Sequence, residues 1–290
     1  MRTSGKLFIA DFDGTLLKDD KTISGKDIKT LEILRQKKIF TSIATGRSVY
    51  SFNKALKDIG LADNFLPPYS LPIDYLIFST GAGIMEFHGG RVIYQKALPI
   101  SDISKITDYL DHRRFDYMVH KSIPDTQYFL YKSHGKDNPD FYKRLALYKE
   151  YALPLEQSHC HKDPSTEVLA IIPGRVNMDD LEIIKKDLSG FSVIHATSPL
   201  DHKSSWIEIF HKDVSKSKAA SWLVKRLGIG RQNVLSVGND YNDQDLLAWS
   251  GKGFVVKNAP DSLKQIFKTV SSNNLCAVSE AIKKAGWLNR

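Results

Sequence analysis

Short apolar runs alternate with amphipathic helical stretches from the start of the chain. The run at residues 7–10 is followed by a helical pattern, which Ser24 and Asp27 open in the manner of a capping box. A second run at residues 39–44 also leads into a helical pattern, for which Gly60 is a natural stop. A strand followed by a helix, repeated in this way, predicts a parallel sheet with helices on both faces.

The same order of elements returns near the C-terminus. A helical pattern at residues 216–227 precedes a strand at residues 233–237, and a helix after Asp243 precedes a strand at residues 253–256. These runs and a third early one, at residues 75–79, are nearly all apolar and do not alternate. Such runs are typical of strands that are buried on both faces.

The middle of the chain shows a different pattern. A helical stretch at residues 103–110 is followed by two strand-like runs, residues 117–119 and 128–131, with a turn between them. Further helices are expected at residues 142–151 and 181–188, and further strands at residues 168–172 and 191–196. Strands that follow one another as hairpins favour a separate domain in this part of the chain.

We therefore predict a two-domain α/β protein. Residues 1–85 and 205–290 form a doubly wound, Rossmann-like core with a parallel sheet, and residues 86–204 form an inserted α/β domain.

The composition excludes several classes of protein. Hydrophobic residues make up 42% of the chain and charged residues 26%, as in a globular protein. The apolar run before Asp11 is too short for a signal peptide or a spanning helix, so we expect a cytoplasmic protein without a membrane partner. Cys160 and Cys276 predict neither a disulfide framework nor a zinc ribbon. His159 and His161 flank Cys160, and a polar loop is favoured there over a metal site.

The net charge leaves the partner open. The chain has 41 basic and 33 acidic residues, a formal charge of +8, which suits nucleic acid, anionic membranes or phosphorylated molecules. No block of five or more like charges occurs, and the lysines are spread over the expected helices. The charge alone therefore does not identify a ligand.

Polar motifs follow the expected core strands, at the edge of the sheet where ligands bind in open parallel sheets. Asp-Phe-Asp-Gly-Thr stands at residues 11–15, Thr-Gly-Arg at residues 45–47 and Gly-Asn-Asp-Tyr-Asn-Asp at residues 238–243. Two carboxylates beside a glycine turn can serve different purposes, because their side chains point in different directions. Thr45 and Gly46 offer a hydroxyl and an N–H at a helix N-terminus, which favours phosphate.

With these motifs the chain resembles the haloacid dehalogenase-like superfamily, and within it the Cof-type sugar-phosphatase branch with a large α/β cap. The resemblance covers the whole chain. It implies a Mg2+-dependent phosphatase of small phosphate monoesters, with sugar phosphates favoured, in which the inserted domain is the cap. Asp11 would be the nucleophile and form an aspartyl-phosphate, and Asp13 would act as general acid and then as general base.

The resemblance also assigns the remaining site residues. It implies catalytic roles for Asp11, Asp13, Thr45 and Lys216, phosphate or substrate contacts for Phe12, Gly46, Arg47 and Asn242, and Mg2+ ligands among Asp11, Asp13, Asn239, Asp240 and Asp243. Asp13 would bind the metal through its backbone carbonyl. Lys216 is preferred to Lys212 and Lys218, because Val-Ser-Lys at residues 214–216 best matches the family pattern Gly-Val-x-Lys, although Asp213 replaces the glycine.

The chain departs from the family pattern at Asn239. The usual motif is Gly-Asp-x-x-Asn-Asp, but here the second position is Asn239 and the carboxylate stands at Asp240. Either Asn239 binds the metal as a neutral ligand, or the loop shifts and Asp240 does. A second departure is Thr80, at a position where the family often has asparagine.

Two other functions remain open at this stage. One is a phosphosugar mutase on the same scaffold, which would return the phosphoryl group to its substrate. The other is a catalytically weakened protein that uses its +8 charge to bind a polyanion. For the favoured reading we expect a small phosphorylated metabolite as partner, no nucleic acid, and a monomer or small homo-oligomer.

Overall fold

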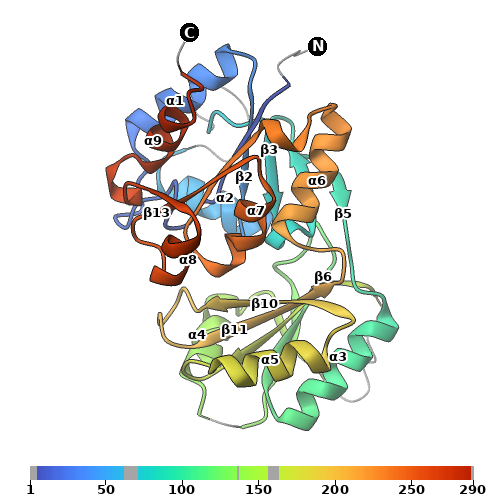
Figure 1. Cartoon of the computed structure of the whole chain (residues 1–290). Helices are drawn as coiled ribbons and strands as arrows, with labels where there is room; N and C mark the ends of the chain where they lie inside the picture. The colour runs from blue at the N-terminus through green and yellow to red at the C-terminus, as the bar shows by residue number, and fades with distance from the viewer. Residues whose placement is uncertain (1–4, 62–70, 136, 156–162, 289–290) are drawn as a thin grey trace. The chain divides into compact units, whose positions relative to one another are not determined.

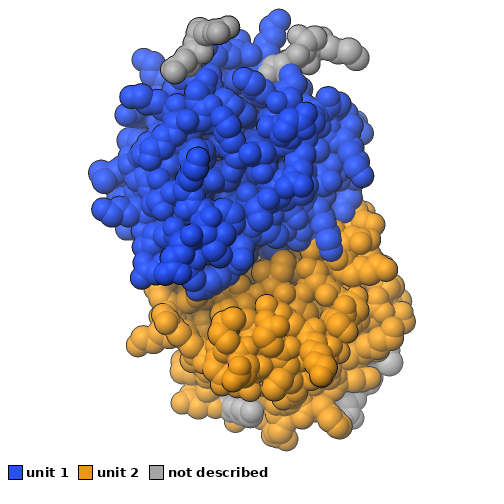
Figure 2. All heavy atoms as spheres, viewed as in Figure 1, with its two compact units in different colours: residues 1–94, 215–290 blue, residues 95–214 orange. Residues whose placement is uncertain are grey.

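A computed structural model describes residues 5–61, 71–135, 137–155 and 163–288. The chain forms two compact units, unit 1 with residues 1–94 and 215–290, and unit 2 with residues 95–214 (Figure 2). The sequence placed the same two junctions earlier in the chain, at residues 86 and 205.

Unit 1 is built on an eight-stranded sheet with β1 (Leu7–Ala10) in its interior. The strand order is β14-β13-β12-β1-β2-β3-β4-β5, in which the strands from β14 to β3 run parallel and β4 runs antiparallel to β3. The other strands are β2 (Phe40–Ala44), β3 (Tyr75–Phe78), β4 (Gly83–Glu86), β5 (Arg91–Gln95), β12 (Val234–Gly238), β13 (Lys252–Val256) and β14 (Lys268–Val270). The predicted doubly wound α/β core is confirmed.

Helices cover this sheet. They are α1 (Gly25–Gln36), α2 (Val49–Asp58), α6 (Lys216–Leu227), α7 (Gln244–Trp249), α8 (Asp261–Ile266) and α9 (Ala277–Lys284). Leu7 and Ile9 of β1 belong to one apolar cluster with Ala219 and Leu223 of α6, while Phe8 between them is also fully buried. Because side chains alternate along a strand, β1 is buried on both faces, as its unbroken apolar run predicted.

Helix α1 begins where the sequence indicated, but Asp27 has a different partner. Ser24 caps the helix by accepting the N–H of Lys26. Asp27 accepts the N–H of Ser279 in α9 at 2.8 Å, so it is not the second half of a capping box. The hydroxyls of Thr30 and Ser279 lie 2.9 Å apart, and these polar contacts join α1 to α9, which lie side by side (Figure 1).

Unit 2 contains a six-stranded sheet of order β10-β11-β9-β6-β7-β8, antiparallel except for the β7–β8 pair. Its strands are β6 (Asp116–Lys121), β7 (Phe129–Lys132), β8 (Ala152–Pro154), β9 (Ser165–Ile172), β10 (Phe191–Thr197) and β11 (Ser205–His211), and its helices are α3 (Ile100–Arg113), α4 (Pro139–Leu147) and α5 (Met178–Asp187). Helices α3 and α5 pack on one face of the sheet, and Phe141 of α4 packs on the other.

The junctions differ from the sequence prediction because of three strands. Strands β4 and β5 extend the sheet of unit 1, with Gly89 and Gly90 in the turn between them at φ 103° and 64°. Strand β11, which the sequence placed in the core, pairs with β9 and β10 of unit 2. Helix α4 also starts earlier than expected, since Asn138 caps it at the N–H of Phe141. Among the helices that the structure describes, none has the length and apolar character needed to span a membrane.

Candidate active site

The three sequence motifs meet at one edge of the sheet of unit 1. Strand β1 pairs in parallel with β2 on one side and with β12 on the other. The segments that follow these neighbouring strands therefore leave from the same, carboxyl-terminal edge.

A buried lysine joins two of these segments. Lys216, the first residue of α6, is fully buried, and its Nζ lies 2.7 Å from Asp11 Oδ1 and 2.5 Å from Asp243 Oδ1. The other oxygen of Asp243 accepts the N–H of Asn239 at 2.8 Å and that of Asp240 at 3.2 Å. Asp243 thus holds both the lysine and its own loop.

The charges of this group depend on one another. Burial and the neighbouring Asp243 raise the pKa of Asp11 to about 8 in the metal-free protein, while Lys216 opposes the shift. Burial lowers the pKa of Lys216, but the two carboxylates outweigh it and hold that pKa above its usual range. The lysine therefore stays an ammonium group against Asp11.

Asn239 faces the other oxygen of Asp11. The terminal amide atom that Asn239 turns toward the site lies 3.0 Å from Asp11 Oδ2, 3.0 Å from the backbone oxygen of Asp13 and 3.2 Å from Thr15 Oγ1. Oxygens on adjacent corners of an octahedron around Mg2+ are about 2.9 Å apart, because each lies about 2.0–2.1 Å from the ion. When its side-chain oxygen points toward Asp11 and Asp13, Asn239 can form a ligand set with the Asp11 carboxylate and the Asp13 carbonyl. The spacing of these three oxygens fits Mg2+.

Asp240 does not join this set. Its side chain accepts the N–H of Tyr241 at 2.8 Å and caps the short helix η3 (Tyr241–Asp243). In the described parts of the chain, no three imidazole, thiol or carboxylate side chains gather as metal ligands. The geometry at this loop thus favours the amide of Asn239 and a backbone carbonyl beside one carboxylate, and the assignment of Asp240 and Asp243 as ligands has no contact to support it.

Asp13 has a separate side-chain partner, Arg47. Its two carboxylate oxygens accept from Nε and Nη2 of Arg47 at 2.6 Å and 2.7 Å, a two-pronged ion pair. Arg47 lies over the ring of Phe12, 5.7 Å from its centroid, and also donates to Ser51 of α2. Phe12 is fully buried against α2, so its backbone alone is left to contact a ligand.

Thr45 and Gly46 precede helix α2 instead of opening it. The helix starts at Val49, and Ser48 is its N-cap. The hydroxyl of Thr45 accepts the N–H of Arg47 at 3.1 Å, which makes a tight turn before the helix. The expected helix N-terminus at Thr45 and Gly46 is therefore wrong, because the turn is closed by a side chain and not by helical hydrogen bonds.

Polar groups from three segments gather around Gly46. A methyl group at this glycine would lie 3.6 Å from Thr80 Oγ1 and 3.9 Å from Asn242 Nδ2. The backbone N–H of Thr80 donates to the carbonyl of Thr45 at 3.1 Å. Gly46 and Asn242, predicted from separate motifs, are thus neighbours.

Three residues outside the predicted set of site residues also lie here, among them Thr80, the second departure from the family pattern. Thr15 contacts Asn239, Thr80 lies beside Gly46, and Asn258 donates to the carbonyl of Gly14 at 2.9 Å. The hydroxyl of Thr15, directly after the turn glycine, was a usable signal. The position of Thr80 depends on a chain path at φ 55° that no local pattern indicates.

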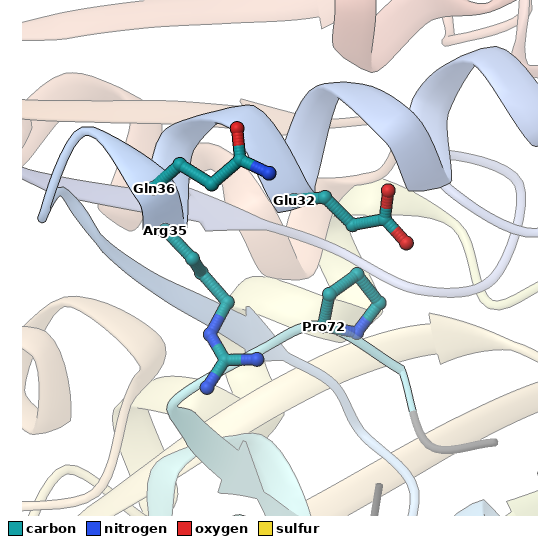
Figure 3. A pocket seen from close by; sticks show the side chains of 4 residues that line it. All are labelled: Glu32, Arg35, Gln36 and Pro72. Atoms are coloured by element: carbon teal, nitrogen blue, oxygen red, sulfur yellow. The ribbon is translucent and has the colours of Figure 1, made fainter. Parts of the chain in front are cut away.

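A pocket of about 360 Å³ lies elsewhere in unit 1, lined by Glu32, Arg35 and Gln36 of α1 and by Pro72 (Figure 3). Arg35 donates to Asp74, directly before β3, so the pocket lies at the amino-terminal edge of the sheet and shares no residue with the site. The predicted polar loop at residues 159–161 lies outside the described residues.

The comparisons with known proteins agree over nearly the whole chain. The model of a family described as haloacid dehalogenase-like hydrolase matches residues 8–282. The 5-amino-6-(5-phospho-D-ribitylamino)uracil phosphatase YitU of Bacillus subtilis (strain 168) is 24% identical, over 98% of this chain and 98% of its own. Among solved structures, BT1666 of Bacteroides thetaiotaomicron, from the phosphatases of the haloalkanoate enzyme superfamily, has a TM-score of 0.76 at 18% identity, covering 99% of this chain and 97% of its own. The subclass IIB sugar phosphatase BT4131 has a TM-score of 0.72 at 17% identity, covering 97% and 99%.

Proposed function

The chain belongs to the haloacid dehalogenase-like hydrolases, and we propose that it is a Mg2+-dependent phosphatase of small phosphate monoesters, with sugar phosphates as the favoured class. One observation carries the proposal. Asp11 is buried between Lys216 and Asn239, whereas Asp13, two residues further on, is partly exposed and has a separate partner in Arg47. The two carboxylates therefore have environments suited to two different tasks.

Asp11 is the proposed nucleophile. Lys216 holds one of its oxygens, and the other faces the side-chain amide of Asn239. A carboxylate oxygen of Asp11 forms a bond to phosphorus as the bond from phosphorus to the ester oxygen breaks, which leaves an aspartyl-phosphate. Water then attacks the phosphorus, the bond to Asp11 breaks, and inorganic phosphate leaves. Lys216 balances the negative charge of the phosphoryl group throughout.

Asp13 is the proposed proton carrier. It gives a proton to the departing ester oxygen and then takes one from the attacking water, so that it ends as it began. Arg47, which is anchored in turn on Ser51, contacts both oxygens of Asp13 and limits the directions in which its carboxyl group can point.

Phosphate would lie against Thr45, Gly46 and Asn242, whose polar groups surround a position without a side chain. The Asp11 carboxylate, the Asp13 carbonyl and the Asn239 amide would hold Mg2+, which when bound neutralises charge on the phosphoryl oxygens. We further propose that unit 2 is the cap and sets substrate choice. The names of the subclass IIB sugar phosphatase BT4131 and of YitU, which acts on a phosphorylated ribityl compound, support a sugar-phosphate class.

The test is a panel of phosphorylated metabolites, assayed for release of inorganic phosphate with Mg2+ and with chelator. We expect release to require Mg2+ and to need no bisphosphate activator, since an activator would indicate return of the phosphoryl group to the substrate. Asp11→Asn should abolish both turnover and the phosphoenzyme, because an amide cannot supply the attacking oxygen. Normal turnover in Asp11→Asn would refute the nucleophile.

A further inference from the structure

The carboxamide of Asn239 has two possible orientations with different partners. With Oδ1 toward the site, it accepts from Thr15 Oγ1 at 3.2 Å. With Nδ2 toward the site, it donates to Asp11 Oδ2, to the Asp13 carbonyl and to Thr15 Oγ1 at 3.0, 3.0 and 3.2 Å. The chemical surroundings decide between the two, because the outlines of the amide oxygen and nitrogen are nearly alike.

The side chain has little room to do anything except turn over in place. The backbone N–H of Asn239 donates to Asp243 Oδ2 at 2.8 Å. On the other side lies Gly14, where an added methyl group would come within 2.7 Å of the Asn239 amide. The amide is therefore confined between the turn and its own loop, and a half rotation exchanges its oxygen and nitrogen.

Each orientation suits one state of the site. An oxygen only 3.0 Å from the oxygens of Asp11 and Asp13 is repelled unless a cation lies among them. A nitrogen at the same place donates its two N–H groups to those oxygens and needs no cation. An aspartate at this position would have no such second state.

We propose that Asn239 is a cation-dependent switch: in the metal-free protein its N–H groups bind Asp11 and Asp13, and Mg2+ turns the amide so that its oxygen becomes a ligand. The inference rests on the proposed function for the identity of the cation. It gives this chain a metal-free state that is already satisfied, so Mg2+ must displace hydrogen bonds instead of relieving repulsion between carboxylates. The chain should consequently be more stable without metal, and bind Mg2+ more weakly, than with aspartate at this position.

Thermal unfolding in chelator and in saturating Mg2+ tests this, with the full-length wild type and three variants. Asn239→Ala should lower the Tm in chelator by roughly 3–8 °C, because Asp11 loses a donor. Asn239→Asp should lower the Tm in chelator at least as much as Asn239→Ala does. Its Tm should rise more on addition of Mg2+ than that of the wild type. A titration of Tm with Mg2+ should show that it binds the ion at least about tenfold more tightly than the wild type.

Asn258→Asp is the matched control, because its amide also donates to this turn, at the Gly14 carbonyl, but does not face Asp11. Its Tm should lie below that of the wild type by the same amount in chelator and in Mg2+. In addition, the side-chain amide signal of Asn239 in a 15N spectrum, assigned by its loss in Asn239→Ala, should move on addition of Mg2+.

Four results would overturn the inference. Asn239→Ala as stable as the wild type in chelator would show that the donor orientation contributes nothing. An equal Mg2+ gain in the wild type and in Asn239→Asp, or a stationary amide signal while Mg2+ raises the Tm, would show that the amide does not turn over. If Mg2+ changes neither the wild type nor Asn239→Asp, the proposed metal site itself is wrong, and the inference is lost with it.

Discussion

At the scale of residues, the candidate site depends on how the neighbours separate two similar carboxylates. Asp11 is surrounded by buried groups and shares Lys216 with Asp243. Asp13 is 44% exposed and bound to Arg47. Both residues come from one short turn, so the distinction arises from side chains that other strands bring to it.

This arrangement predicts that substitutions at Asp13 and at Arg47 reduce the rate of hydrolysis by different amounts. Asp13→Asn should slow hydrolysis of a sugar phosphate by about 100-fold to 10,000-fold, the usual range for a lost general acid and base. Arg47→Lys should cost less, about tenfold, because a single ammonium can hold only part of the two-pronged pair. Steady-state rates on a sugar phosphate and on an activated aryl phosphate measure this.

The aryl ester serves as the control, since its leaving group hardly needs a proton. Arg47→Lys should recover most of the wild-type rate on it if Arg47 acts by orienting Asp13. Equal losses on both esters would contradict that role and indicate direct phosphate binding by Arg47. Wild-type rates for Asp13→Asn on the sugar phosphate would disprove the proton carrier.

At the scale of elements, α6 has the position that brings Lys216 to Asp11. Gly81, at φ 101°, lies so close to the start of this helix that an added methyl group would be 2.3 Å from the carbonyl of Ser215. Ser215 caps α6 by accepting the N–H of Lys218. The segment after β3 therefore packs directly against the N-terminus of the helix that carries the lysine.

In unit 2, two adjacent strands bring carboxyl groups together. Glu167 of β9, whose side chain is 16% exposed, lies near Glu208 of β11. Desolvation together with Glu208 raises the pKa of Glu167 to about 8, against the effect of Arg144. Near them, His120 of β6 is buried, and its pKa is lowered to about 3 by burial and by Arg144. Glu167 therefore keeps its proton in the folded chain, and His120 stays neutral.

The pKa of Glu167 is higher in the folded chain than in the unfolded chain, where it is near 4.5. Its contribution to stability is therefore complete below pH 4.5 and is lost as the pH rises through 8. His120 acts in the opposite direction below pH 6.5. Between pH 6.5 and 8 Asp11 contributes a fall of the same sign, so it is the difference between the wild type and a Glu167 variant that isolates the glutamate.

Glu167→Gln should reduce the fall in the free energy of unfolding between pH 6.5 and 8. Between pH 5 and pH 8, the free energy of unfolding of the variant should rise by about 1–3 kcal/mol relative to that of the wild type. Urea unfolding at several pH values measures it. Glu182→Gln, at an exposed position of α5, is the control and should follow the wild type. A variant curve parallel to that of the wild type would show that Glu167 ionises freely.

At the scale of the whole molecule, the site residues discussed here all belong to unit 1. Asp11, Lys216 and Asn239 come from its two separated stretches of sequence, residues 1–94 and 215–290. Unit 2 lies between these stretches in the sequence and has its own sheet and its own apolar clusters. Catalysis and substrate choice can therefore be tested apart.

Replacing residues 95–214 by a short linker should leave hydrolysis of a small aryl phosphate dependent on Mg2+ but remove discrimination among sugar phosphates. Ratios of kcat/KM over the panel measure this, and the shortened chain with Asp11→Asn is the control for contaminating activity. The cut at residues 95 and 214 keeps β4 and β5 and removes all of β11, unlike one at residues 86 and 204. Unchanged ratios in the shortened chain would contradict the cap role.

Local sequence patterns determined the general architecture. The strand and helix patterns predicted the parallel core, and α6 starts and ends where its pattern does, because burial of an apolar run and capping of a helix depend on neighbours within a few positions. They also predicted that the motifs after β1, β2 and β12 would meet, since parallel neighbours end at one edge.

Tertiary structure decided the partners. Three contacts were not indicated by the local sequence patterns: β11 pairs within the sheet of unit 2, Asp27 pairs with Ser279, and Arg47 binds Asp13. The same holds for Asn239, which meets Asp11 across more than two hundred residues. Such contacts depend on which chain segments pack together, and a side chain's charge or orientation follows from that packing and not from its immediate neighbours in the sequence.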